Sequence, residues 1–149
     1  MKSKEHWEKV YTAKAPDNVS WFQPHAEMSM RLIHDTGLGC DAAIIDVGGG
    51  ASTLVDDLLD DGYRALTVLD LSAAALNETL RRLGTKGESV RWMEADITQA
   101  VFEPYSFDVW RDRAVFHFLT TDEDRKAYVK QVLRALKPGG HVIMATFGS

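Results

Sequence analysis

Short apolar runs alternate with stretches of helical spacing along most of this chain. The apolar runs cover 42–47, 64–69, 90–93, 107–111 and 141–147, and the helical spacing covers 52–60, 73–83 and 122–136. Short apolar runs bounded by glycines or polar turns predict buried strands, whereas apolar residues three and four apart predict amphipathic helices. Strands that alternate with helices predict an α/β fold, a doubly wound, mostly parallel sheet with helices on both faces.

The first 40 residues follow a different pattern. Apolar and aromatic residues at helical spacing predict helices over 4–11 and 25–36, and polar residues around a proline predict a loop over 14–18. At 149 residues the chain has the length of one domain. We expect N-terminal helices over 1–40 and the α/β core over 41–149.

A glycine cluster follows the first predicted strand. The segment 44–52 reads Ile-Ile-Asp-Val-Gly-Gly-Gly-Ala-Ser, which predicts a strand that turns sharply into a helix. Glycine has no Cβ, so such a turn brings backbone N–H groups close to a ligand. Asp70 ends the next strand, 24 positions after Asp46, and an acid there can accept hydrogen bonds from both hydroxyls of a ribose. Together these features predict a pocket for an adenosine-containing cofactor.

Acidic residues stand at or just past the ends of four predicted strands, at Asp46, Asp70, Asp96 and Asp112. Sheets of this kind bind ligands beyond the carboxyl ends of their strands, so we expect the four acids to line one rim. Such a rim would repel a pyrophosphate, and Thr53 occupies the third glycine position of a dinucleotide fingerprint. A cationic cofactor without phosphate, such as S-adenosylmethionine, fits better.

Composition narrows the partners further. The net charge of −5 argues against a nucleic-acid surface, because phosphate contacts need clustered Lys and Arg. No apolar run approaches the roughly 20 residues of a membrane span. The single cysteine, Cys40, excludes an internal disulfide and a cysteine-based zinc site, and we expect no metal. The default expectation is a cytoplasmic protein.

Over nearly its whole length the chain resembles the class I S-adenosylmethionine-dependent methyltransferases, which have a Rossmann-like fold. The matching segments are 46–52 (Asp-Val-Gly-Gly-Gly-Ala-Ser), 70–72 (Asp-Leu-Ser), 94–97 (Glu-Ala-Asp-Ile), 107–109 (Phe-Asp-Val) with Asp112 after it, and 133–140 (Leu-Arg-Ala-Leu-Lys-Pro-Gly-Gly). One departure is Ser52, where many members have a third glycine. The family usually continues with a helix and two more strands, so the resemblance implies a sheet that lacks the usual last two strands.

The resemblance implies roles for the glycine turn and the acids around it. Gly48 and Gly50 would let the backbone pass beside the methionine part of S-adenosylmethionine, and Asp46 would hold that part directly or through water. Asp70 would bind the ribose hydroxyls. Asp112 would lie near the ammonium group of the cofactor, although an ion pair with a neighbouring arginine is an alternative for it.

The same resemblance implies an adenine site and an N-terminal lid. Asp96 would accept a hydrogen bond from the adenine amino group, with Leu71 and Ile97 on the two faces of the ring. Tyr11 and Trp21 would close over the cofactor, which would make 1–40 a lid.

Catalysis itself points to few residues. His117 is the candidate general base, although its place in the hydrophobic stretch 115–119 also fits a structural histidine. The leading hypothesis is methyl transfer from S-adenosylmethionine to a small-molecule or protein side-chain nucleophile, which leaves S-adenosylhomocysteine. The alternative is a methyltransferase-like cofactor-binding or partner domain without turnover. An NAD(P)-binding oxidoreductase fragment is a distant third.

The last predicted strand, over 141–147, raises a question of assembly. With nothing after it, this apolar strand would be an uncovered sheet edge, and such edges pair with other chains. We therefore expect either a truncated chain or a homodimer that forms along this edge, and a minimal form of the fold is the third explanation.

Overall fold

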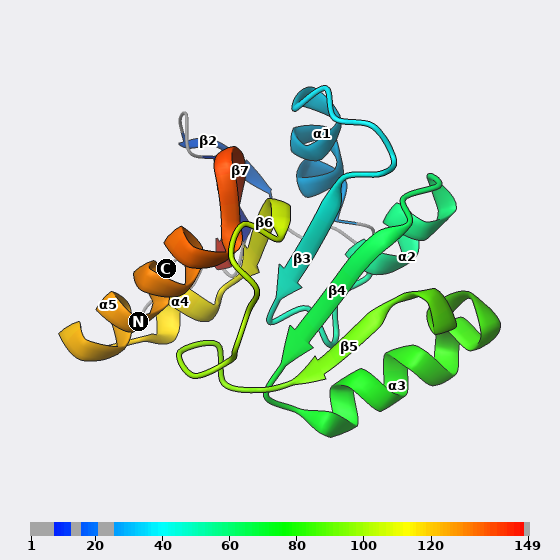
Figure 1. Cartoon of the computed structure of the whole chain (residues 1–149). Coiled ribbons are helices and arrows are strands. Elements are labelled where there is room, and N and C mark those ends of the chain that lie inside the picture. Colours follow the sequence, from blue (N-terminus) through cyan, green and yellow to red (C-terminus); the bar gives the residue numbers. More distant parts are fainter. Residues whose placement is uncertain (1–7, 13–15, 21–25, 148–149) are drawn as a thin grey trace.

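The described residues form a seven-stranded sheet with helices on both faces (Figure 1). The computed structural model describes residues 8–12, 16–20 and 26–147. The strand order is β2-β1-β7-β6-β3-β4-β5. The strands are β1 (Glu8–Thr12), β2 (Pro16–Ser20), β3 (Ala43–Val47), β4 (Ala65–Asp70), β5 (Arg91–Glu94), β6 (Phe107–Arg113) and β7 (Leu136–Phe147).

The five strands from β3 to β7 are parallel, as the alternation of strand and helix predicts. From β3 the chain proceeds through β4 to β5 on one side and then crosses to β6 and β7 on the other. The strand order therefore reverses between β3 and β6, and in sheets of this type ligands bind at the carboxyl ends of the strands beside that reversal.

Helices precede or follow most of the parallel strands, and those predicted over 25–36, 52–60, 73–83 and 122–136 lie close to the predicted positions. They are α1 (Glu27–Asp35), α2 (Leu54–Asp60), α3 (Ala73–Leu83), the 3-10 helix η1 (Gly84–Ser89), α4 (Val115–Phe118) and α5 (Asp122–Ala135). Ser72 and Thr121 cap α3 and α5: their hydroxyls accept from Ala75 N and Asp124 N, each at 3.1 Å.

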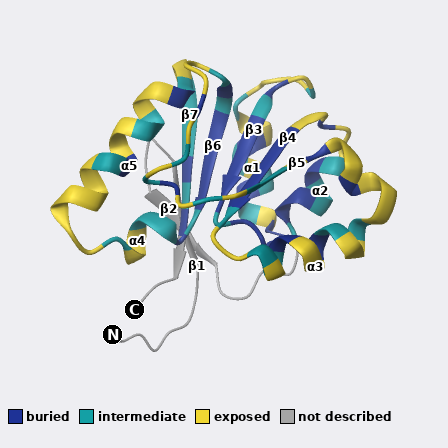
Figure 2. Cartoon of the chain, turned by 60° about the horizontal axis from the view of Figure 1, so that its bottom comes forward, coloured by how far each residue is buried: buried dark blue, intermediate teal, exposed yellow. Residues whose placement is uncertain are grey.

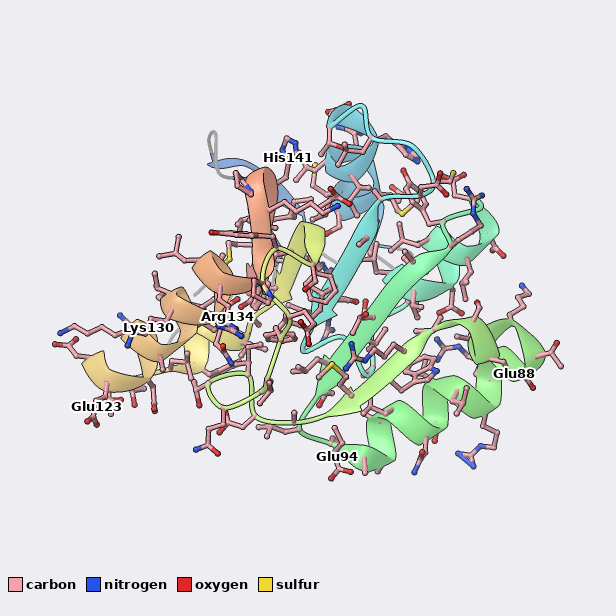
Figure 3. All side chains as sticks on the ribbon, viewed as in Figure 1. Glu88, Glu94, Glu123, Lys130, Arg134 and His141 are labelled. Carbon is pink, nitrogen blue, oxygen red and sulfur yellow. The ribbon has the colours of Figure 1, made fainter. Side chains whose placement is uncertain are left out.

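Two hydrophobic cores lie on opposite faces of the sheet (Figure 2). One contains Ile44 and Val109 from the sheet with apolar residues of α1, α2 and α3. The other contains Ile45 and Trp110 with residues of α5 and of the segment 97–107. Neighbouring residues of one strand thus face different cores, as the two-residue period of a strand requires. Charged side chains of α5, such as Glu123 and Lys130, point away from the sheet (Figure 3).

Two N-terminal predictions, over 4–11 and 14–18, were wrong, whereas the helix predicted over 25–36 is present as α1. Where a helix over 4–11 and a loop over 14–18 were expected, the structure has the strands β1 and β2, which pair antiparallel. The segment 8–12 is too short for its apolar spacing to distinguish a helix from a strand, and its Val, Tyr and Thr residues favour a strand.

The same hairpin corrects the expected uncovered edge. β1 pairs antiparallel with β7, from Glu8 opposite Phe147 to Thr12 opposite Ile143. The edge that was expected to be free for a homodimer is therefore covered by the chain itself. The resemblance implied a sheet without its usual last two strands. In the structure, the N-terminal strands β1 and β2 extend the sheet beside β7.

The Pro-Gly-Gly segment 138–140, between the predicted helix over 122–136 and the predicted strand over 141–147, forms a bulge inside β7. Phe107 pairs with Leu136 and Val109 with His141, so an advance of two positions along β6 matches an advance of five positions along β7. Gly139 has φ +82° in this bulge, a left-handed conformation that glycine adopts without strain.

The two capped helices give a stability test. Removing the cap with Ser72→Ala or Thr121→Ala should lower the free energy of unfolding by about 1 kcal/mol each, because a helix N–H loses its acceptor. In a domain of this size that loss corresponds to a fall in Tm of about 2–4 °C. Thr85→Ala, an exposed position, is the control in thermal unfolding. Capping variants as stable as T85A would contradict the assigned caps.

Candidate functional site

A pocket of about 440 Å³ opens at the carboxyl ends of β3 and β4, beside the point where the strand order reverses. Its walls come from the turn after β3, the end of β4, the segment after β5 and the region from β6 to α4. The lining residues are Val47, Gly48, Leu69, Asp70, Leu71, Ala95, Asp96, Ile97, Arg113, Ala114, Val115, Phe118 and Leu119. This is the place where the sequence predicts a ligand.

The glycine turn is packed so tightly that side chains would not fit. Gly48 has φ +76°, and a Cβ at this position would lie 2.4 Å from Val115 Cγ2. A Cβ at Gly50 would lie 2.8 Å from Asp70 Oδ2. The turn therefore needs glycine at Gly48 for its backbone conformation, and at both Gly48 and Gly50 because neighbouring atoms approach so closely.

Asp70 is fixed by two backbone amides. Its Oδ2 accepts from Gly50 N and its Oδ1 from Ser72 N, both at 2.9 Å. A carboxylate oxygen has two lone pairs, so each oxygen can accept a further hydrogen bond from a ligand. The glycine turn thus holds an acceptor with free lone pairs at the pocket wall, and the chemistry of these residues fits an adenosine group.

The other residues expected around an adenine ring also line this pocket. Asp96 is exposed, and its Oδ1 accepts from Thr98 N at 2.9 Å and from Thr98 Oγ1 at 2.7 Å. Ile97 is buried, whereas Leu71 is 71% exposed. Asp96, Ile97 and Leu71 are thus brought to one pocket with Asp70.

Asp46 and Asp112 correct the expectation that four acids line one rim, since both are buried inside the protein. Asp46 pairs with Arg111, whose Nη1 lies 3.0 Å from Asp46 Oδ1. Burial raises the pKa of Asp46, and the Arg111 guanidinium acts in the opposite direction. Side chains at the end of a strand still alternate between the two faces of the sheet, so an acid at a strand end need not point into the pocket.

Asp112 lies on the other face of the sheet and organises α4. Its Oδ1 accepts from Val115 N at 2.6 Å, and its Oδ2 accepts from Phe116 N at 3.0 Å and from the Tyr128 hydroxyl. Tyr128 in turn accepts from Trp110 Nε1 at 2.9 Å. This network fixes the start of α4, which carries the pocket residues Val115 and Phe118.

Of the three remaining candidate residues, the structure describes the side chain of His117 alone. His117 is exposed on α4, with its ring 5.4 Å from that of Phe118 and outside the residues that line the pocket. Tyr11 is on β1, where its backbone pairs with Met144. Trp21 lies outside the described residues.

The sequence patterns did not identify several residues of the site. Arg113, Val115 and Phe118 line the pocket, and Arg111 and Tyr128 hold its walls. One signal was available for Arg111: it interrupts an apolar strand, and a buried charge requires a partner of opposite sign. Tyr128 carries no comparable signal, because a tyrosine inside an amphipathic helix usually only packs.

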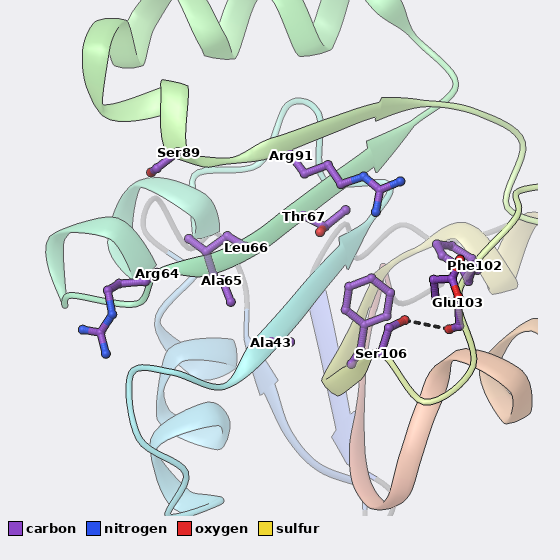
Figure 4. Close-up of a pocket in the computed structure, with 11 residues that line it drawn as sticks. Ala43, Arg64, Ala65, Leu66, Thr67, Ser89, Arg91, Phe102, Glu103 and Ser106 are labelled. Atoms are coloured by element: carbon purple, nitrogen blue, oxygen red, sulfur yellow. Dashed lines mark hydrogen bonds between the residues drawn. The ribbon is translucent and has the colours of Figure 1, made fainter.

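A second hollow of about 280 Å³ lies at the opposite, amino end of the strands (Figure 4). Arg64, Thr67 and Arg91 are among the residues around it. It shares no lining residue with the larger pocket and contains none of the residues that the sequence predicts for a cofactor.

The described part of the chain offers no cluster of three or more His, Cys, Asp or Glu side chains placed to hold a metal ion. Within that same part, every helix is too short or too polar to span a membrane.

The fold and the site define a class I methyltransferase, and comparison with known proteins agrees. The profile of the family described as "Methyltransferase domain" matches residues 44–140, and the chain belongs to this family. It is 25% identical over 141 residues to the mouse "eEF1A lysine and N-terminal methyltransferase", a match that covers 95% of the chain and 20% of the mouse protein. It is 27% identical over 158 residues to the zebrafish "EEF1A lysine methyltransferase 2", covering 97% of the chain and 68% of that protein.

Solved structures share the fold. The glycopeptide N-methyltransferase MtfA complexed with S-adenosylmethionine superposes with a TM-score of 0.67 at 18% identity, over 83% of this chain and 55% of MtfA. The chain spans about a fifth of the length of the mouse relative that it matches.

The network around Asp112 gives a test that needs no ligand. Tyr128→Phe leaves Asp112 without one donor and the Trp110 indole N–H without its acceptor, so it should lower the free energy of unfolding by about 1–3 kcal/mol. Urea unfolding measures the loss, and Tyr105→Phe, an exposed tyrosine, is the control. A variant as stable as Y105F would contradict the network.

The same variant has a predicted pH dependence. Burial raises the pKa of Asp112 above its ordinary value of 3.8, so folding becomes less favourable as the pH rises through the window above that value and the carboxyl loses its proton. Without the hydrogen bond from the Tyr128 hydroxyl, the ionised carboxylate of Asp112 is less stable. The loss in Y128F should therefore be larger at pH 8 than at pH 5, and an equal loss would contradict this role.

Proposed function

We propose that this chain binds S-adenosylmethionine in the pocket beside β3 and β4 and transfers its methyl group to an amino nitrogen of a protein. The observation that carries the proposal is the Asp70 carboxylate, held at the pocket wall by the N–H groups of Gly50 and Ser72. A diol-binding acid fixed by a glycine turn is what an adenosine cofactor requires.

The remaining lining residues suit the rest of the cofactor. Asp96 offers an acceptor for the adenine amino group, and Leu71 and Ile97 offer apolar surface for the ring. Gly48 lines the same pocket, so in this proposal the methionine part lies along the backbone of the glycine turn. In this proposal Asp46 and Asp112 do not touch the cofactor. Asp46 supports the glycine turn from beneath, and Asp112 fixes the start of α4.

Methyl transfer from a sulfonium depends little on general acid–base catalysis. When bound, S-adenosylmethionine supplies a methyl group on a sulfonium, which is itself a good leaving group. The residues of the chain then have to orient the acceptor and exclude water, and the apolar wall of Val115, Phe118 and Leu119 provides that surface. A neutral amine needs no general base, and His117, exposed on α4, is the candidate to take a proton from an ammonium.

The acceptor class is inferred from what the similar proteins are named for. The mouse and zebrafish relatives are named for lysine methylation of elongation factor 1A, and the mouse one also for N-terminal methylation. MtfA is named for N-methylation of a glycopeptide. All three names specify or fit a nitrogen nucleophile, so a protein lysine or N-terminal amine is the first candidate and a small-molecule amine is the second.

Calorimetric titration tests the cofactor site. S-adenosylhomocysteine should bind the wild type, and Asp70→Asn should weaken binding at least tenfold, because one ribose acceptor becomes a donor. Asp60→Asn, an exposed carboxylate on α2 paired with Lys86, is the control and should bind as the wild type does. A preference for NADH over S-adenosylhomocysteine would contradict the proposal and favour an oxidoreductase fragment.

Turnover separates an enzyme from a domain that only binds. The chain is incubated with S-adenosylmethionine labelled in its methyl group and with elongation factor 1A, a lysine peptide or a small primary amine. Label should enter the protein or peptide on nitrogen, with release of S-adenosylhomocysteine. Binding of S-adenosylhomocysteine without methyl transfer to any acceptor would contradict the enzyme and favour the binding-domain alternative.

A further inference from the structure

A buried ion pair lies directly beneath the glycine turn. Asp46 on β3 and Arg111 on β6 are opposite each other in the parallel register, with Arg111 Nη1 3.0 Å from Asp46 Oδ1. Their side chains are 3% and 2% exposed. Both project to the face of the sheet that carries α1, α2 and α3, since their strand neighbours Ile45 and Trp110 belong to the opposite core.

Arg111 connects three segments of the chain. Besides Asp46, its guanidinium donates to Ser29 Oγ of α1 at 3.2 Å and to Ser52 Oγ at 3.4 Å. Ser52 closes the glycine turn, because its N donates to Gly49 O at 2.9 Å and its Oγ accepts from Leu54 N at 3.0 Å. A single planar cation thus joins β3, the turn and α1, as the fork of an arginine can and a lysine cannot.

The carboxylate beneath the turn is also a spacer. A Cβ at Gly49 would lie 2.2 Å from Asp46 Oδ2, so the turn rests on this oxygen. Among the described residues Asp46 Oδ2 is buried without a hydrogen-bond partner. The position of the turn therefore depends on where the guanidinium holds Asp46.

We propose that Arg111 is a positioning residue of the cofactor site, which holds the glycine turn in its binding shape through Asp46 and Ser52 and couples that turn to α1 through Ser29. The proposal rests on the proposed function, because the turn is taken to receive S-adenosylmethionine. Arg111 lies outside the residues that line the pocket, so it acts on the cofactor only through the turn.

The charges around Asp46 make this role measurable. Arg111 and Arg113 favour its ionised form, whereas burial and the carboxylate of Asp70 oppose it. Without Arg111, the buried carboxylate loses its main partner and takes up a proton at a higher pH than in the wild type. Binding of the cofactor should then vary with pH in a range where the wild type does not vary.

The experiment is a double-mutant cycle on Arg111→Met and Asp46→Asn, with the dissociation constant of S-adenosylhomocysteine measured by calorimetry between pH 5.5 and 8.5. R111M should weaken binding at least tenfold at pH 8 and recover as the pH falls. In the D46N background the same change should cost less than threefold and show no recovery at low pH. Arg82→Met, which breaks the more exposed pair with Asp56, is the matched control and should leave binding unchanged.

Milder variants decide the outcome if R111M fails to fold. Arg111→Lys keeps a cation for Asp46 but cannot also reach Ser29 and Ser52, and Ser29→Ala removes only the contact to α1. Both should raise the dissociation constant twofold or more, whereas Ser106→Ala, at the far end of the sheet, should not. Thermal unfolding checks that each variant is folded.

The outcomes separate the two proposals. A wild-type chain that does not bind S-adenosylhomocysteine overturns the proposed function. A wild type that binds, with folded Arg111 and Ser29 variants that bind equally well at every pH, overturns the positioning role of Arg111 alone.

Discussion

The site depends on one steric constraint, the close approach of the backbone at Gly48, Gly49 and Gly50 to its neighbours. A Cβ at these positions would collide with Val115, Asp46 and Asp70 in turn. Because the Cβ atoms are missing, α4, the buried ion pair and the Asp70 carboxylate all pack directly against the same turn. Any side chain there would have to displace at least one of them.

The two-residue period of the strands sorts the charged groups around that turn. Asp46 and Arg111 face the helices α1 to α3, where they neutralise each other, and Asp112 faces α5, where Tyr128 and the backbone of α4 satisfy it. The acids at the ends of β3 and β6 thus support the walls of the pocket, and only Asp70 and Asp96 are left at its surface. Burying the two supporting carboxylates is tolerable because each has strong donors within the protein.

Much of this could be predicted from the sequence, because the determining signals are local. The positions of the strands β3 to β7 along the chain, the glycine turn and the place of Asp70 at the end of β4 follow from short patterns with a physical cause, and so do the caps at Ser72 and Thr121. The predictions that failed concern contacts between residues far apart in the sequence. The segment 8–12 is a strand because β7 offers it an edge, and Asp112 is buried because Tyr128, 16 residues later, reaches it across the sheet face. No local pattern encodes either contact.

The central claim is that Asp70, fixed by the glycine turn, receives the ribose of S-adenosylmethionine. A crystal structure of the chain with S-adenosylhomocysteine tests it most directly. We expect both ribose hydroxyls within about 3.2 Å of the Asp70 carboxylate, while the carboxylate keeps its hydrogen bonds to Gly50 N and Ser72 N. A ligand bound elsewhere, or a ribose that leaves Asp70 untouched, would contradict the account.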